Sequence, residues 1–224
     1  LPPPRLPLSS PCSGALICMT AGIEPLVSST ARVGAEEVEY FEVLDEQGRG
    51  TGRRELRAVV HATGLFHRAV YCFVFDTAGR LLIQRRHADK KVGPEQWDLS
   101  VAEHLLPGEC YAAAVVRGLQ EELGIEVSRD AIKGPLTPAH KRSLHLPDIG
   151  VTDNEYVESY QLDGYDGPLK FNSSEVTEVK FVALDEVQVQ MAERPADFTQ
   201  WFKDELSIVR PLLLNSAQID PADN

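Results

Sequence analysis

Apolar positions follow two different periods along the chain, and these periods predict both strands and helices. Runs rich in β-branched and aromatic residues predict strands over residues 38–44, 69–75, 80–84, 155–161 and 178–182. The second and third of these strands are separated by the turn residues Asp76-Thr77-Ala78-Gly79, so they are expected to form a hairpin. Residues 54–60 favour either a short helix or an irregular segment.

A helical period of apolar residues marks residues 109–123. Its apolar positions are Ala112, Val115, Val116, Leu119 and Leu123. Gly124 follows directly and supplies the left-handed position at which helices commonly end. A second amphipathic helix is expected over residues 198–213, interrupted at Pro211. Helices and strands mix without a βαβ rhythm, which predicts an α+β fold with a mixed β-sheet sandwiched between helices.

The two ends of the chain differ in composition from the rest. Residues 1–35 are rich in Pro, Ser, Ala and Gly and carry few charges. This composition is typical of an organellar transit peptide, and also of a disordered extension or of a start placed too early, with Met19 as the initiator. Residues 36–214 are expected to form one folded domain and residues 215–224 a polar tail. The expected location is the cytoplasm, or a plastid or mitochondrion if the leader is a transit peptide.

Composition and charge narrow the class of protein. The chain has 224 residues, of which 34 are Asp or Glu and 22 are Lys or Arg, so its formal net charge is −12. Such an acidic chain lacks the basic surface that binds nucleic acid, and its apolar runs are far shorter than the roughly 20 residues that cross a bilayer. Neither a nucleic acid nor a membrane is an expected partner. The cysteines show no Cys-x-x-Cys spacing, which argues against a disulfide framework and suits a reducing compartment.

The helix predicted over residues 109–123 carries candidate chemistry. Arg117 and Glu121 are four positions apart and share a face, and Glu122 lies one step further round the helix. Neighbouring carboxylates can bind hard divalent cations, which take oxygen ligands and bridge the phosphates of a substrate. Taken alone, the same residues also fit a solvated ion pair that stabilises the helix by about 0.3–0.5 kcal/mol.

This stretch resembles the Nudix box. The pattern of that family is Gly, five residues, Glu, seven residues, and then Arg-Glu-apolar-x-Glu-Glu-x-Gly-apolar. The residues in register with it are Glu109, Arg117, Leu119, Glu121, Glu122, Gly124 and Ile125. The resemblance extends over about residues 36–190 and implies the Nudix fold, an α/β/α sandwich. It also implies a metal-dependent hydrolase in which activated water attacks a phosphoanhydride bond.

Two positions depart from the box. Glu103 stands where the pattern has its first Gly, and Gly118 stands where the pattern has the Glu after the Arg. In the family that Glu usually belongs to the metal-binding carboxylates, so the helix has lost one anionic ligand. Two interpretations stay open: Glu103 partly replaces the missing ligand, or the activity is weakened or lost.

A second resemblance is to type I isopentenyl-diphosphate isomerase, a Nudix-fold enzyme that holds a divalent metal with histidines and carboxylates. It is carried by His67-Arg68-Ala69, by the basic residues before Trp97 and by Asp153-Asn154-Glu155. The positions that match metal ligands are His67, His104, Asp153 and Glu155. His61 is offset by one residue from a further histidine position. Imidazole with carboxylate suits Zn²⁺ or Mn²⁺, whereas ligation by oxygen alone suits Mg²⁺.

The same resemblance places Ala102 where the isomerase has a catalytic cysteine. Alanine cannot transfer a proton, and neither Cys72 nor Cys110 lies at an obvious substitute position. Isomerisation of an alkene needs both an acid and a base, so this activity is disfavoured, although Glu155 stays a candidate acid or base. A hydrolase is therefore expected, with the isomerase and a non-catalytic Nudix-fold binding module as alternatives.

The expected hydrolase combines these residues in one site. The expected ligands of Mg²⁺ or Mn²⁺ are Glu121, Glu122, Glu103, His67, His104, Asp153 and Glu155. The expected catalytic residues are Glu121, Glu122, Arg117 and Glu155. The residues expected to bind the substrate's phosphates are Arg85, Arg86, Lys90 and Lys91. The expected partner is a small-molecule diphosphate, nucleoside-linked or otherwise organic, while its identity and the oligomeric state stay open.

Overall fold

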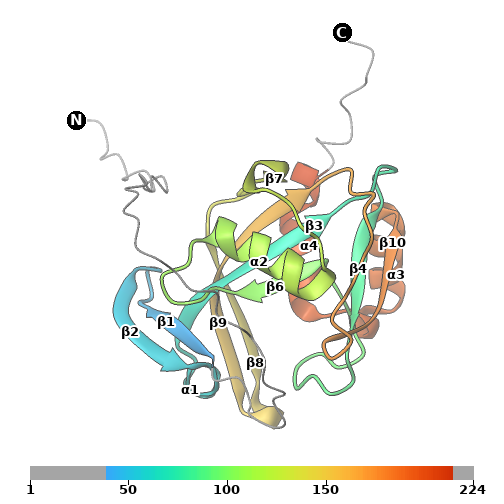
Figure 1. Ribbon diagram of the computed structural model, residues 1–224. Coiled ribbons are helices and arrows are strands. Elements are labelled where there is room, and N and C mark those ends of the chain that lie inside the picture. Colours follow the sequence, from blue (N-terminus) through green and yellow to red (C-terminus); the bar gives the residue numbers. More distant parts are fainter. Residues whose placement is uncertain (1–38, 214–224) are drawn as a thin grey trace, which may run out of the picture. The chain divides into compact units, whose positions relative to one another are not determined.

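The structure, a computed structural model, describes residues 39–213 and shows two sheets with helices on both sides (Figure 1). Its α-helices are α1 (Arg57–Thr63), α2 (Tyr111–Leu123), α3 (Leu184–Glu193) and α4 (Gln200–Leu213). Its strands are β1 (Tyr40–Leu44), β2 (Gly50–Leu56), β3 (Phe66–Val74), β4 (Leu81–Arg86), β5 (Trp97–Asp98), β6 (Val101–His104), β7 (Ile132–Lys133), β8 (His140–Leu146), β9 (Val151–Leu162) and β10 (Val176–Val182). The leader predicted over residues 1–35 and the tail predicted over residues 215–224 lie outside the described residues.

The larger sheet is built around β3 and β9, which pair in parallel. β3 also pairs antiparallel with β1 and β6, β2 joins β1, and the short β7 and the long β8 pair antiparallel with β9. The smaller sheet has the order β10-β4-β5, and its neighbours are antiparallel. This mixed arrangement with its helices confirms the predicted α+β fold. No helix within the described part of the chain has the length and apolar character needed to cross a membrane.

The strand β3 shows why the larger sheet is covered on both faces. Successive side chains of a strand point to opposite faces. Tyr71 and Phe73 pack in one buried cluster with residues of α3 and α4, whereas Val70 and Cys72 pack in another with residues of α2. Figure 1 shows α2 in front of β3 and α4 behind it. A strand that is apolar on both faces is stable only between two such layers, because each apolar face must be removed from water.

The hairpin predicted from the turn at residues 76–79 is wrong. The turn itself is present, since the carboxylate of Asp76 accepts hydrogen bonds from the backbone N–H groups of Ala78 and Arg80. β3 and β4, however, meet only in an isolated bridge between Phe75 and Leu81, and β4 pairs with β10 and β5 instead. A turn sequence determines where the chain reverses, and both edges of β4 are already occupied by other strands of the smaller sheet.

Of the two predictions about helix ends, the end at Gly124 is confirmed and the interruption at Pro211 is wrong. Gly124 has a φ of 66° and ends α2, with its backbone N–H donating to the carbonyl of Gln120. Pro211 does not interrupt the last helix, because α4 continues through it to residue 213, the last described residue. Val209 and Leu213 are buried on either side of the proline, and this packing keeps the last turn helical despite the lost backbone hydrogen bond.

A buried carboxylate connects α4 to the larger sheet. Glu205 is 1% exposed, and its Oε1 accepts a hydrogen bond from the Ser159 hydroxyl at 2.5 Å. Its Oε2 lies 3.0 Å from Nε2 of His140 on β8. The hydrogen bond to Glu205 raises the pKa of His140, and it outweighs burial, which lowers it.

We expect this contact to make stability depend on pH. Because the pKa of His140 is higher in the folded chain than the value of about 6.5 expected when unfolded, protonation favours the folded state. The stabilisation is fully present below about pH 6.5 and is lost as the pH rises through the folded pKa. In urea unfolding, the stability difference between the unchanged protein and His140→Gln should therefore shrink between about pH 5.5 and about pH 8.5. A difference that stays constant over this range would contradict the argument.

Candidate active site

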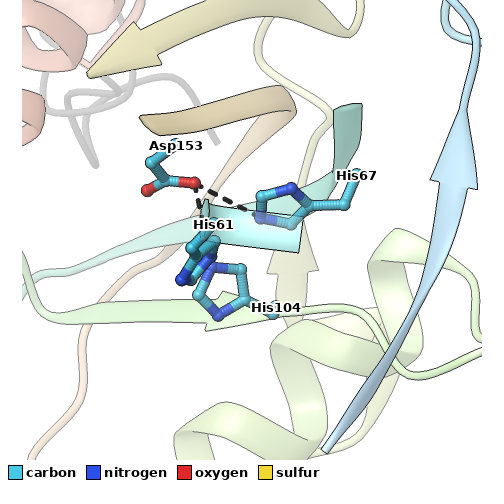
Figure 2. Close-up of side chains that lie close together, drawn as sticks. All are labelled: His61, His67, His104 and Asp153. Atoms are coloured by element: carbon cyan, nitrogen blue, oxygen red, sulfur yellow. Dashed lines mark ion pairs between the residues drawn. The ribbon is translucent and has the colours of Figure 1, made fainter. Parts of the chain in front are cut away.

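Three histidines and an aspartate point their side chains at one another where β3 begins and β6 ends (Figure 2). Ligand atoms of His61, His67, His104 and Asp153 all lie within 4.8 Å of one another. Asp153 Oδ1 is 3.4 Å from His67 Nε2 and 3.6 Å from His61 Nε2, the contacts drawn as dashed lines. Glu155 extends the group, with its Oε1 at 3.2 Å from His104 Nε2. We refer to these five residues as the histidine group.

Strand register explains why these residues converge. His67 lies directly opposite Glu155 in the parallel pair of β3 with β9. His104 lies opposite the residue two positions after His67, in the antiparallel pair of β3 with β6. Residues two apart on a strand share a face, so Asp153 faces the same side as Glu155. The short helix α1 adds His61 to this face from outside the sheet.

Burial keeps the three imidazoles neutral. The side chain of His67 is 1% exposed, and those of His61 and His104 are 15% and 16% exposed. Burial lowers the pKa of all three, that of His61 to about 4 and that of His104 to about 3. The ring of Phe41 on β1 adds cover, stacking on His67 with ring centroids 4.8 Å apart. Neutral imidazoles have the free lone pair that binds a metal ion.

The two carboxylates of the histidine group share one cation, Arg142 of β8. Its Nε donates to Glu155 Oε2 at 2.7 Å, and its Nη2 donates to the same oxygen and, at 2.9 Å, to Asp153 Oδ2. The hydroxyl of Tyr71 also donates to Glu155 Oε2, at 3.1 Å. Burial opposes ionisation of Glu155, but Arg142 and His104 outweigh it and hold the pKa of this carboxyl well below its usual range. Burial and the charge of Glu155 raise the pKa of Asp153 to about 7.

Unsatisfied atoms show that the histidine group fits a metal ion. Nε2 of His61, Nε2 of His67 and Oδ1 of Asp153 are buried and have no hydrogen-bond partner among residues 39–213. A buried polar atom left unpaired costs about 1–3 kcal/mol, and several that converge on one point fit an ion that all of them could bind. Two ring nitrogens and a carboxylate oxygen are a donor set that suits Zn²⁺ or Mn²⁺.

A second group of carboxylates surrounds Arg117 of α2. Its Nε donates to Glu109 Oε1 at 3.0 Å, and its Nη1 lies 3.0 Å from Glu121 Oε2 and 3.2 Å from Glu103 Oε2. Glu109 also accepts a hydrogen bond from the backbone N–H of Leu106, which closes the loop before the helix. One guanidinium therefore connects β6, the loop and α2, and it sets the direction in which each carboxylate points.

Glu122 completes this carboxylate group from beneath α2. It is 7% exposed and accepts a hydrogen bond from Gln84 Nε2 on β4 at 2.8 Å, and no Lys or Arg of residues 39–213 forms an ion pair with it. Burial, followed by the negative charge of Glu103, raises the pKa of Glu122 well above its usual range. Burial also raises the pKa of Glu103, to about 7. Glu103, Glu109 and Glu121 share the single charge of Arg117, and Glu122 has no cation beside it in the described part of the chain. This excess of negative charge fits a hard divalent ion such as Mg²⁺ or Mn²⁺.

The two groups come from opposite faces of the larger sheet and meet at the end of β6. Glu103 and His104 are consecutive on this strand, so the first faces α2 and the second faces the histidine group. Even so, ligand atoms of Glu39, Glu103 and His104 lie within 4.8 Å of one another. The histidine group and the carboxylate group are therefore neighbours, joined through Glu103 and His104.

The basic residues predicted to bind phosphate are partly engaged with the protein. Arg86 donates to Asp98 Oδ2 at 3.2 Å and to a backbone carbonyl of the loop that follows β4. Arg85 donates to another carbonyl of that loop, and Lys90 lies 3.3 Å from a glutamate oxygen. Lys91 is exposed and makes no ion pair within residues 39–213. Of the four, Lys91 is the freest to meet an anion.

Sequence reasoning missed Arg142 and Gln84, which contact the carboxylates of the two groups. No motif marks either residue, and their side chains reach the site only through strand pairing. His61 was recognised only as offset by one residue from a histidine position. Since it belongs to a helix, its spacing from His67 along the chain does not fix where its ring lies.

Comparison with known proteins identifies the family of this site. Residues 65–202 match the NUDIX domain. The chain belongs to the Nudix family. It is 33% identical to an isopentenyl-diphosphate Delta-isomerase of Streptomyces avermitilis, over 80% of this chain and 87% of that protein. It is 32% identical to an uncharacterized Nudix hydrolase of Listeria monocytogenes, over 67% of this chain and 83% of that protein.

Solved structures agree with the Nudix fold. The crystal structure of DR0079 from Deinococcus radiodurans matches 77% of this chain and 98% of its own, with a TM-score of 0.57 and 21% sequence identity. A MutT protein of Methanosarcina mazei matches 68% of this Nudix chain and 96% of its own, with a TM-score of 0.52 and 16% identity. The predicted Nudix fold and membership of the Nudix hydrolase superfamily, in its isopentenyl-diphosphate-isomerase-like branch, are therefore confirmed.

Proposed function

We propose that this Nudix protein is a metal-dependent hydrolase that cleaves the phosphoanhydride bond of a small-molecule diphosphate, nucleoside-linked or otherwise organic. The observation that carries the proposal is the meeting of two sets of ligand atoms at the end of β6. A diphosphate carries adjacent anionic groups on both sides of the bond to be broken, which suits a site with positive charge on two sides. The similarity to proteins named as Nudix hydrolases supports the same class of reaction.

The two groups of ligand atoms suit different metal ions. The carboxylate group offers Mg²⁺ or Mn²⁺ the oxygens of Glu103 and Glu122, beside Glu121. The histidine group offers Mn²⁺ or Zn²⁺ the side chains of His61, His67, His104, Asp153 and Glu155. When bound, such ions neutralise phosphate charge and lower the pKa of bound water towards about 7. Arg117 orients the carboxylates, and Lys91 with the neighbouring basic residues attracts the phosphates.

The surroundings of the glutamates favour one of them as the general base. Glu155 is poorly suited, because its Oε2 already accepts from Tyr71 and Arg142. Glu122 is buried and short of positive charge, which suits a metal ligand better than a base. The side chain of Glu121 is 58% exposed and bonds Arg117 through one oxygen, leaving the other to take a proton from water. We assign proton transfer to Glu121.

The isomerase is the second candidate function, because the chain is similar to proteins of that name and has the histidine group that the resemblance implies. Two features argue against it. Ala102 has no proton to transfer. Glu155 is held ionised by Arg142, so it is a poor proton donor to an alkene. A binding module without turnover is the third possibility that an assay must separate.

The test is an assay of the purified protein on nucleoside, sugar, prenyl and dinucleotide diphosphates, with Mg²⁺ or Mn²⁺ and with a chelator. Both released phosphate and isomerised product are measured. We expect phosphate release from at least one class of diphosphate, abolished by the chelator. Isomerised product without phosphate release would instead establish the isomerase. Metal binding with no turnover of any compound would contradict the hydrolase and indicate a binding module.

A further inference from the structure

Gly118 is buried in the middle of α2, where the helix crosses β6. A β-carbon built at this position would lie 2.8 Å from Val101 Cγ1 and 3.2 Å from Glu103 Cβ. Close-packed protein interiors do not accommodate a carbon at the first of these distances without movement of the neighbours. Glycine is unfavourable inside a helix, so the close approach of the strand is the reason that a side chain is missing here.

Val101 is the nearest neighbour of Gly118, and the side chain of Glu103 lies beside it. The Cγ of Glu103 would lie 3.5 Å from the built β-carbon, so the stem of this side chain lies against the backbone of the helix. One of its carboxylate oxygens accepts a hydrogen bond from the backbone N–H of His104 at 2.8 Å, and the other lies 3.2 Å from Arg117 Nη1. The charge of Glu103 also acts on Glu122. The strand thus delivers a carboxylate to the same place as the acidic residues of α2.

We infer that Glu103 and Gly118 form one functional unit, in which the strand supplies a metal-binding carboxylate and the helix supplies the space that admits it. The inference rests on the proposed function for the presence of the cation. It makes Glu103 a ligand and Gly118 a positioning residue. The two positions at which the chain departs from the Nudix box are then linked, because a side chain at position 118 would meet both Val101 and the stem of Glu103.

The experiment measures the affinity of the protein for Mn²⁺. One equivalent of Zn²⁺ is added first to fill the histidine group, so that the Mn²⁺ titration measures binding to the carboxylate group. The variants are Glu103→Ala, Gly118→Glu, and these two combined with Val101→Ala, which removes the atom nearest to the added β-carbon. Glu103→Ala is expected to weaken Mn²⁺ binding roughly 10- to 100-fold, and Gly118→Glu to lower Tm through overcrowding. The combined variant is expected to bind Mn²⁺ within roughly threefold of the unchanged protein and to melt above Gly118→Glu. Glu126→Ala, at an exposed position beyond the helix, is the matched control and should change neither quantity.

Either of two results would overturn the inference: unchanged Mn²⁺ affinity in Glu103→Ala, or a combined variant that binds no better than Glu103→Ala. If Gly118→Glu does not fold, Gly118→Ala keeps the test decisive. At an uncrowded helix position this change raises Tm, whereas here it should lower Tm, and a higher Tm would contradict the inference. The titration uses no substrate, so the expected affinities without any diphosphate turnover would contradict the proposed function alone. Turnover with an unaffected Glu103→Ala variant would contradict this inference alone.

Discussion

Replacing Arg142 with methionine is expected to destabilise the metal-free protein by about 3–5 kcal/mol. Methionine fills much of the same volume but leaves Asp153 and Glu155 without the cation that they share. Their side chains are 14% and 3% exposed, so water cannot take over the role of the guanidinium. In saturating Zn²⁺ the loss should be smaller, because an ion that binds only the folded state adds both stability and positive charge. Denaturant unfolding with chelator and with Zn²⁺ measures both values.

The control for this prediction is Arg49→Met. Arg49 pairs with Asp45 at 2.8 Å, but its side chain is 75% exposed, and surface ion pairs of this kind contribute little to stability. Losses of similar size in the two variants would contradict the importance of the Arg142 contacts. A loss for Arg142→Met that is equal with chelator and with Zn²⁺ would contradict the fit of the histidine group to a metal ion.

Replacing Glu122 with glutamine is expected to reduce metal-dependent hydrolysis by roughly 10²- to 10³-fold or more. Losing a charge that holds the ion removes several kcal/mol of transition-state stabilisation, and each 1.36 kcal/mol is about a factor of ten. Glutamine has the same shape and can still bond to Gln84. The substitution also replaces a buried carboxylate that has no cation beside it among the described residues with a neutral amide, so Tm should be unchanged or higher. The measurements are kcat at saturating Mn²⁺ and Tm in chelator.

Glu126→Gln removes the same charge from an exposed position and should leave kcat unchanged. Full activity in Glu122→Gln would remove Glu122 from the metal site and weaken the proposed reaction. Lost activity together with a large fall in Tm would also count against the argument, because glutamine keeps the hydrogen bond from Gln84 and only the charge is removed.

Some elements of the fold could be predicted from the sequence and others could not. The helix α2 was predictable because its apolar residues recur at helical spacing and Gly124 ends it. The strand β8 escaped prediction because its side chains alternate between exposed and half-buried and none is fully buried, so only its pairing with β9 makes it a strand. The helix α3 has just two buried residues, Leu184 and Val187, which are too few to define a helical period.

The candidate site shows the same limit. His67, His104, Asp153 and Glu155 were selected from the sequence, and the structure brings them together, while their roles in a reaction stay predictions. Arg142 could not be selected, because a single basic residue in an unrecognised strand carries no pattern. Its contact with two acidic side chains depends on the register of β8 against β9, and register is set by the whole sheet.

The part of the chain that matches the NUDIX domain starts at residue 65, after both His61 and Phe41. The third imidazole and its aromatic cover therefore come from an appendage that precedes the matched core. Under the proposed function, changes in that segment would alter which ion the histidine group prefers and would leave the box on α2 unchanged. A protein built in this way can change the ligands of the histidine group without changing those of the carboxylate group.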